Sequence, residues 1–292
     1  MTTTFLLRLA VTATMLAATA VATAQRPQYQ AEDSILVEKL LVEGASQPEQ
    51  TNLMVFFGKK LCGTPYVAKT LERNNTERLV INLRELDCTT FVENVLALTL
   101  CTENGKTDFC DFCRYLRNIR YRKGHVTYPD RHHYFTEWIE DNTAQGFVHE
   151  VQGPNPPFTA VQTVNVNYMT TNTSQYPMLK GNRDFIRQIA RNERNISKRR
   201  YRYIPKSSIA NNRLFRNTIH DGDIIAILTS RKGLDTSHIG IAVWLDDGLH
   251  LLNASRLHGK VVLEPKLLRT YMAGQRMQTG IRIIRKNQGV LH

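Results

Sequence analysis

The chain of 292 residues lacks the features that mark several common protein classes. It has five cysteines, two tryptophans and, after its first 24 residues, no long apolar run. A transmembrane helix needs about 20 consecutive apolar residues, so none is expected beyond that point. We find no internal repeat and no low-complexity segment, which excludes repeat proteins and disordered linkers. An apolar content of 42% instead fits a globular protein with a sizeable core.

The small, odd number of cysteines limits the role of disulfides. At least one thiol must stay unpaired within the chain, and a chain of this length does not need disulfides to be stable. Cys110 and Cys113 have the spacing of a redox pair or of half a zinc site, but no second ligand pair follows at finger spacing. For Cys62, Cys101, Cys110 and Cys113 we expect structural disulfides or inert buried thiols, and the pairing stays open.

The first 24 residues have the pattern of a signal peptide. Arg8 precedes an apolar run rich in Ala, Val and Leu, and Ala22-Thr23-Ala24 provides a small-x-small cleavage site. A membrane anchor is the alternative, although the run is short for a span. We therefore expect an exported protein, periplasmic or secreted, with no stable membrane span after signal cleavage.

The chain has fewer acidic than basic residues: it contains 26 Asp and Glu and 38 Lys and Arg, which gives a formal net charge of +12. A basic surface attracts anionic partners. Because export is expected, we predict an anionic polymer of the cell envelope or its fragments as the partner, and no nucleic acid. The densest basic stretch, residues 183–202, has Phe185, Ile186 and Ile189 at helical spacing, which predicts an amphipathic helix with a solvated basic face.

The apolar pattern predicts helices in the first half of the chain and strands in the second. Helical spacing indicates two helices within 33–60 and further helices starting at 88 and covering 108–120 and 133–142, with a short extended run at 79–83. Strand-like runs cover 223–228, 238–244, 249–253, 260–263 and 280–284, with a hairpin turn at 246–248.

This order predicts an α+β fold in which N-terminal helices pack on one side of a C-terminal antiparallel sheet. Residues 145–177 change in character and indicate an inserted loop and hairpin. We expect a single domain over 25–292, with an insertion at about 145–205.

Cys88 is the first candidate for chemistry. It stands at the start of an expected helix, with Asp87 or Cys88 itself at the cap position and Thr89 in the first turn. The unpaired N–H groups there favour the thiolate and lower the thiol pKa from its usual value of about 8.5. The same groups can donate to an oxyanion. The alternative is a small, buried and inert residue at a helix start.

His238 and Asn253 are candidate partners of this thiol. His238 begins an apolar strand after the polar Asp235-Thr236-Ser237, so its ring is expected at a strand end, where a cleft would lie. A neutral imidazole can accept the thiol proton and later protonate a departing amine. Asn253 ends the next strand, and its amide oxygen could hold the imidazole tautomer, as the third member of a triad does.

The segments that carry these residues resemble a known family. LDCTTFVENVLAL, SHIGIAVW and LLNAS resemble, in this order, the NlpC-type papain-like cysteine hydrolases of bacterial cell walls. FFGKKLCGTPYVAKTLE, RHHYFTEWI, GDIIAILT with GLDTSHIGIA, and KVVLEP resemble the N-acetylmuramoyl-L-alanine amidase-like branch of these enzymes. The resemblance covers roughly residues 50–286 and implies a papain-like fold with Cys88 as nucleophile, His238 as base and Asn253 as the orienting residue. Asn253 stands where this branch more often has His, but the role requires only an acceptor.

The resemblance also implies a substrate. This branch cuts the bond between the lactyl group of N-acetylmuramic acid and L-Ala in peptidoglycan or muropeptides, without cofactor or metal, whereas the wider group more often cuts γ-D-glutamyl bonds. That alternative stays open. Aromatic and basic groups suit a sugar face and peptide carboxylates. The candidate substrate contacts are Tyr66, Asp87, Thr89, Arg131, His133, Tyr134, Asp235 and Ser237.

Structural roles for some of these residues and two other protein classes remain as alternatives. Helix-cap packing would explain His132 and His133, and Glu93 is expected to form a salt bridge or a buried hydrogen bond. A zinc amidase would use the chain's histidines, but no H-E-x-x-H or similar pair is present. A non-catalytic module that binds cell-wall glycan would explain the charge and leave the Cys–His–Asn order unexplained. The sequence does not indicate an oligomeric state.

Overall fold

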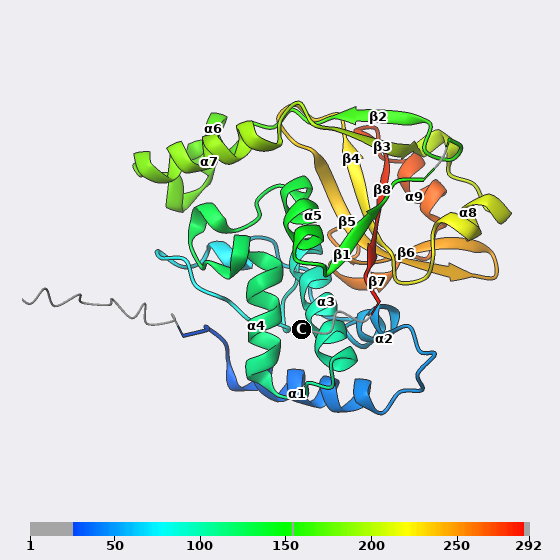
Figure 1. The fold of residues 1–292 in the computed structure, drawn as a ribbon, viewed down its shortest axis with the longest axis horizontal. Coiled ribbons are helices and arrows are strands. Elements are labelled where there is room, and N and C mark those ends of the chain that lie inside the picture. The colour runs from blue at the N-terminus through cyan, green and yellow to red at the C-terminus, as the bar shows by residue number, and fades with distance from the viewer. Residues whose placement is uncertain (1–25, 154, 289–292) are drawn as a thin grey trace, which may run out of the picture.

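The structure is a computed structural model that describes residues 26–153 and 155–288, shown in Figure 1. The signal peptide expected for residues 1–24 lies outside these residues. The α-helices are α1 (Ala31–Ala45), α2 (Leu53–Lys60), α3 (Cys88–Glu103), α4 (Phe109–Arg120), α5 (Phe135–Ala144), α6 (Tyr168–Thr171), α7 (Arg183–Ile196), α8 (Arg213–Thr218) and α9 (Leu268–Ala273). The strands are β1 (Val148–Val151), β2 (Ala160–Thr163), β3 (Arg200–Pro205), β4 (Ile224–Thr229), β5 (Thr236–Leu245), β6 (Gly248–Ser255), β7 (Lys260–Leu263) and β8 (Gln278–Lys286).

The described strands form one antiparallel sheet in the order β2-β3-β8-β4-β5-β6-β7, with β1 also paired to β8. β8 carries two short strands along one edge, because Ile204 of β3 lies opposite Ile281 and Val151 of β1 lies opposite Ile283. Its other edge pairs with β4. The five strands predicted for the C-terminal part are all present, and β5 and β6 form the predicted hairpin.

Side chains are packed on both faces of this sheet. On β4, Ile224 and Ala226 belong to the core shared with α1 to α5, whereas Ile225 and Ile227 belong to a second core shared with α8 and α9. A strand buried on both faces is apolar at every position, which explains its uninterrupted run. The mixed helix and antiparallel sheet class is confirmed. The expectation of helices on one side alone is wrong, because α8 and α9 cover the second face (Figure 1).

The predicted N-terminal helices agree with α1 to α5. Each of α2, α3 and α4 begins after an Asn or Asp whose side chain accepts a hydrogen bond from the first turn, and such caps are readable in sequence. The extended run predicted at 79–83 forms no strand. Within it, Val80 makes a single bridge to Gln28.

The segment 145–205 is built into the fold rather than forming a hairpin of its own. β2 pairs with β3, which follows it after α6 and α7, and β1 and β3 both join β8. The basic helix predicted over 183–202 ends at Ile196, and the chain turns at Lys198, which has a φ of 70°, before entering β3. α7 contributes Ile189 to a third apolar cluster, which also contains Tyr128.

The remaining structural predictions concern thiols and membrane spans. All five cysteines are free, so disulfides are not formed; Cys101 and Cys113 are buried, whereas Cys62 and Cys110 are exposed. Among the residues the structure covers, no helix combines the length and the apolar character needed to cross a bilayer.

Candidate active site

Cys88 is the first residue of α3. The Asp87 side chain caps this helix by accepting from the Thr90 N–H at 2.9 Å, and the Thr90 hydroxyl oxygen accepts from the Asp87 N–H at 2.9 Å. This double cap holds the chain direction at Cys88. The Cys88 N–H has no acceptor among the described residues, and the Thr89 N–H is directed to the Cys88 sulfur, so both donors lie beside it.

His238 lies near the start of β5, as its sequence context predicts, and Asn253 lies on the neighbouring β6. His238 Nε2 is 2.9 Å from Asn253 Oδ1. Asn253 is fully buried, and its Nδ2 donates to the Leu251 carbonyl at 3.1 Å, which turns Oδ1 toward the imidazole. Because Oδ1 can only accept, His238 Nε2 carries the proton and Nδ1 keeps its lone pair. The ring is therefore oriented as a base.

The start of α3 meets the start of β5. Hydrogen-bonding groups of Ile239, the residue after His238, and of Thr89 favour the Cys88 thiolate. Burial and the neighbouring Asp87 carboxylate outweigh them and raise the pKa of the Cys88 thiol to about 12. This direction is opposite to the one predicted from the helix dipole, because loss of hydration dominates. The resting sulfur is a neutral thiol.

The imidazole of His238 is neutral as well. Burial lowers its pKa below the usual 6.5, while the bond to Asn253 and the Asp87 carboxylate act in the opposite direction. Near neutral pH the site therefore holds a thiol and an unprotonated imidazole rather than an ion pair. A base of this kind can accept the thiol proton as the sulfur attacks.

Tyr66 lies beside the same thiol. Its backbone bridges to Leu86, two residues before Cys88, and its N–H donates to the Gly259 carbonyl at 2.8 Å. Burial, Cys88 and Asp87 raise the pKa of the Tyr66 phenol to about 12, so the hydroxyl keeps its proton. The structure thus places Tyr66 close to Cys88, where it can donate a hydrogen bond.

A pocket of about 200 Å³ opens next to the cap of α3. Four of the candidate contact residues line it, namely Asp87, Thr89, Arg131 and His133. Gln175 and Tyr176 from the segment between α6 and α7 form part of its wall. Sequence reasoning missed these two, because nothing in a loop 87 residues after Thr89 shows that it returns there. The available signal was only the change of composition in that segment.

Two arginines that line this pocket are already paired. Arg120 donates from Nε to Glu93 at 2.6 Å, and the two side chains are only 1% and 2% exposed. Arg131 pairs with Glu72 and with Glu77, the latter at 3.3 Å. Glu93 is therefore a buried ion-pair residue, as expected. Arg131 shapes the pocket wall with a charge that its two carboxylates largely neutralise.

The histidines of this region differ in their roles. Burial and the Arg131 charge lower the pKa of His133 well below its usual value, and its Nε2 donates to the Tyr128 carbonyl at 2.7 Å. His132 is buried against Asp141 at 3.2 Å. Both line the pocket as neutral or paired groups of its wall.

Besides Tyr66, three candidate contact residues lie outside the pocket lining. The Tyr134 hydroxyl is buried and donates to Glu193 at 2.7 Å. The Asp235 carboxylate accepts from the N–H groups of Thr136 at 2.6 Å and Thr236 at 2.8 Å. The Ser237 hydroxyl donates to the Ile227 carbonyl at 3.3 Å. These side chains join β5 and α7 to neighbouring elements.

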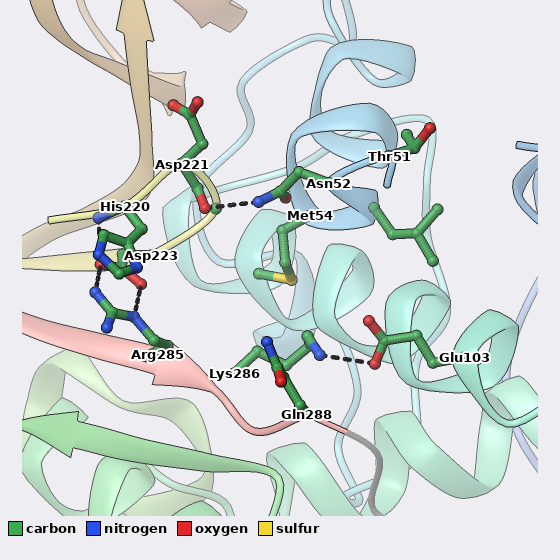
Figure 2. A pocket seen from close by; sticks show the side chains of 12 residues that line it. Thr51, Asn52, Met54, Glu103, His220, Asp221, Asp223, Arg285, Lys286 and Gln288 are labelled. Atoms are coloured by element: carbon green, nitrogen blue, oxygen red, sulfur yellow. Dashed lines mark hydrogen bonds and ion pairs between the residues drawn. The ribbon is translucent and has the colours of Figure 1, made fainter. Parts of the chain in front are cut away.

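A second hollow of about 300 Å³ lies at the other end of α3, which is about 22 Å long. Figure 2 shows two ion pairs in its lining, with Arg285 bonded to Asp223 and Lys286 bonded to Glu103. None of the candidate site residues lines it. In the described part of the chain, no group of three or more His, Cys, Asp or Glu side chains is placed to hold a metal ion.

Comparisons with known proteins find one matching family. The family described as AmiA-like, N-acetylmuramoyl-L-alanine amidase-like, matches residues 56–281. A solved N-acetylmuramoyl-L-alanine amidase from Bacteroides uniformis is 35% identical, with a TM-score of 0.75 over 84% of this chain and 99% of its own. A Bacteroides fragilis protein described as a candidate xylanase is 38% identical, with a TM-score of 0.72 over 78% of this chain and 98% of its own.

A Legionella pneumophila protein shares the fold at 19% identity and a TM-score of 0.63, over 87% of this chain and 94% of its own. No curated protein sequence matches the chain. The family match spans most of the residues described, from α2 to β8, and includes Cys88, His238 and Asn253. The chain belongs to the N-acetylmuramoyl-L-alanine amidase-like family.

Proposed function

We propose that this protein is an exported cysteine amidase of the papain-like, NlpC-type group. It hydrolyses the amide bond between the lactyl group of N-acetylmuramic acid and L-Ala in peptidoglycan or its fragments. The family description and the name of the Bacteroides uniformis neighbour support the choice of bond. The observation that carries the mechanism is the 2.9 Å bond from His238 to Asn253 beside Cys88. Export rests on the N-terminal sequence pattern.

The first step is acylation of the thiol. His238 Nδ1 takes the proton from Cys88 Sγ as Sγ attacks the lactyl carbonyl carbon, and the carbonyl electrons move onto oxygen. The N–H groups of Cys88 and Thr89 in the first turn of α3 donate to this oxyanion. The Asn253 oxygen holds the protonated ring in place by accepting from Nε2.

Collapse of the oxyanion breaks the C–N bond. The imidazolium of His238 gives its proton to the departing L-Ala nitrogen, and a thioester remains on Cys88. His238 then deprotonates a water that attacks the thioester. The products are a free lactyl carboxylate and a peptide with a free L-Ala amino group, and Cys88 regains its proton.

The pocket beside Asp87 and Thr89 is the site we assign to the part of the substrate next to the scissile bond. It adjoins the helix start that carries the thiol, and it combines the Tyr176 ring with polar wall groups. Aromatic rings next to polar side chains suit both a sugar face and a peptide.

Glycoside hydrolysis, suggested by the name of the Bacteroides fragilis neighbour, has weaker support in this chain. That reaction uses two carboxyl groups free to act on the glycosidic bond. In the pocket, Glu93 is locked to Arg120, Glu72 to Arg131, and Asp87 caps α3.

The test uses a soluble muramyl peptide of defined sequence and mass spectrometry of its products. Cys88→Ala and His238→Ala should each abolish release of the L-Ala-initiated peptide, whereas Cys110→Ala, an exposed thiol away from the pocket, should not. Circular dichroism would show that the variants fold. Full activity of Cys88→Ala, or loss of activity in chelator with recovery on adding zinc, would overturn the thiol mechanism. A cut after D-Glu would keep the mechanism and change the bond.

A further inference from the structure

The positive charge of the chain is concentrated in one segment. Residues 180–202 contain nine Lys and Arg side chains and two acidic ones, a net charge of +7 out of the chain's +12. The segment forms α7, the turn after it and β3. Figure 1 shows these elements along one edge of the molecule, together with α6 and β2 and far from α1 and α2.

The arginines of α7 share one face. Arg183, Arg187, Arg191 and Arg194 follow one another at intervals of four, four and three residues, which aligns them along the helix. All four are exposed. Arg187 pairs with Asp184, whereas the other three have no ion-pair partner among the described residues. We call this row the arginine ridge, and the exposed Arg200 and Arg202 of β3 continue the positive charge beyond it.

The opposite face of α7 packs on Tyr128 and Pro129, which lie just before the pocket residues Arg131, His132 and His133 in the chain. Phe185 stacks on Tyr128 with ring centroids 6.0 Å apart. Asn192 donates from Nδ2 to the Pro129 carbonyl at 2.7 Å, and Ile189 is buried. The chain that enters α7 also supplies Tyr176 to the pocket. The ridge is thus a rigid cationic row next to the candidate site, and the fold does not need its charge.

We propose that the arginine ridge is a docking surface for the polyanionic cell-wall polymer, and that it binds carboxylates of stem peptides neighbouring the one that is cut. The identity of the polymer rests on the function proposed above. Guanidinium groups pair with carboxylates through two parallel hydrogen bonds, and a row of them fits a ligand with repeated carboxylates. The protein would therefore act on intact polymer better than on small fragments.

The same face is less suited to a lipid bilayer or to a single-stranded nucleic acid. On α6, α7 and β3 the structure shows no exposed large apolar or aromatic side chain, and β2 exposes Val161 alone. Interfacial helices insert such side chains into the bilayer, but the apolar face of α7 is already buried in the protein. Single-stranded nucleic acids need exposed aromatic rings for base stacking.

The test is co-sedimentation of the full chain with purified, insoluble peptidoglycan, in a Cys88→Ala background so that the polymer stays intact. Arg183→Glu, Arg191→Glu and Arg194→Glu are combined in one variant. The matched control combines Arg213→Glu, Arg269→Glu and Arg276→Glu, which are exposed, unpaired among the described residues, and lie on or beside α8 and α9. Both variants change the net charge equally, and a milder ridge variant with Gln at the three positions guards against misfolding.

The ridge variant should bind the polymer about tenfold more weakly, the Gln variant should be intermediate, and the control should bind like the parent. Parent binding should weaken steeply with added salt. With the thiol restored, hydrolysis of a soluble muramyl peptide should be equal in the parent and in the three variants. Equal polymer binding by the ridge variant and the control would overturn the proposal, as would tighter binding of the parent to phosphatidylglycerol vesicles or to oligonucleotides. Failure to hydrolyse the soluble peptide would instead refute the proposed function.

Discussion

Asn253 offers the sharpest test of how the site is organised. Its Oδ1 accepts from His238 Nε2 at 2.9 Å in a fully buried position, so Asn253→Ala leaves a buried N–H without an acceptor. Such a loss costs about 1–3 kcal/mol. If this free energy destabilises the His238 tautomer that acts as the base, kcat/KM drops about 5- to 150-fold. Removing the base itself, as in His238→Ala, should lower kcat/KM far more than Asn253→Ala does.

The pH dependence separates this role from simple packing. The bond to Asn253 raises the pKa of His238 against the larger effect of burial. Asn253→Ala removes that contribution, so the pKa of His238 should fall further and the acid limb of kcat/KM should move to lower pH. Asn253→Asp introduces a carboxylate, which favours the imidazolium and should move the acid limb to higher pH.

The assay is kcat/KM for a soluble muramyl peptide between pH 4 and pH 9 in buffers of constant ionic strength, with thermal unfolding as a check on the fold. The wild-type acid limb should have its midpoint below the usual imidazole pKa of 6.5, because burial lowers the pKa of His238. If both Asn253 variants keep wild-type rates and the same acid limb, Asn253 does not orient the base.

Other parts of the account can be tested separately. Because burial raises the pKa of the Cys88 thiol to about 12, its alkylation by iodoacetamide should increase about tenfold per pH unit up to pH 10, whereas a plateau below pH 8 would show a resting thiolate. Arg120→Met strands the buried Glu93 carboxylate and should cost about 3–5 kcal/mol in urea unfolding. Arg73→Met, which removes the exposed Arg73–Glu85 pair, should lower the free energy of unfolding by under about 1 kcal/mol. Equal losses in Arg73→Met and Arg120→Met would contradict the argument from burial. Tyr176→Ala removes a ring from the pocket and should raise KM about tenfold with little change in kcat. A fall in kcat at unchanged KM would contradict a role of this ring in binding the substrate.

Local signals in the sequence were sufficient for much of the fold. The Asp87 cap and the apolar run behind it place the start of α3 at Cys88, and the turn at Asp247 places the β5–β6 hairpin. Hairpins bring neighbouring strands together, so the approach of His238 and Asn253 could be predicted. These features depend on contacts between residues close in sequence.

Long-range pairing and desolvation could not be predicted in this way. Nothing local shows that β1 and β3 both pair with β8, or that Tyr176 returns to the pocket beside Thr89. The pKa of Cys88 was expected to fall, because a helix start can be seen in sequence but the burial of its sulfur cannot. The buried pairing of Arg131 with two carboxylates is likewise a property of the folded chain.

The central claim is that Cys88, with His238 as base, cuts the muramyl–L-Ala bond. The most direct measurement is hydrolysis of a defined muramyl peptide in ¹⁸O-labelled water, followed by mass spectrometry of the wild-type and Cys88→Ala products. The account predicts one ¹⁸O atom in the lactyl carboxylate of the muramic acid product, an unlabelled peptide that begins with L-Ala, and no product from the variant. Label at a D-Glu carboxylate, or cleavage by Cys88→Ala, would contradict it.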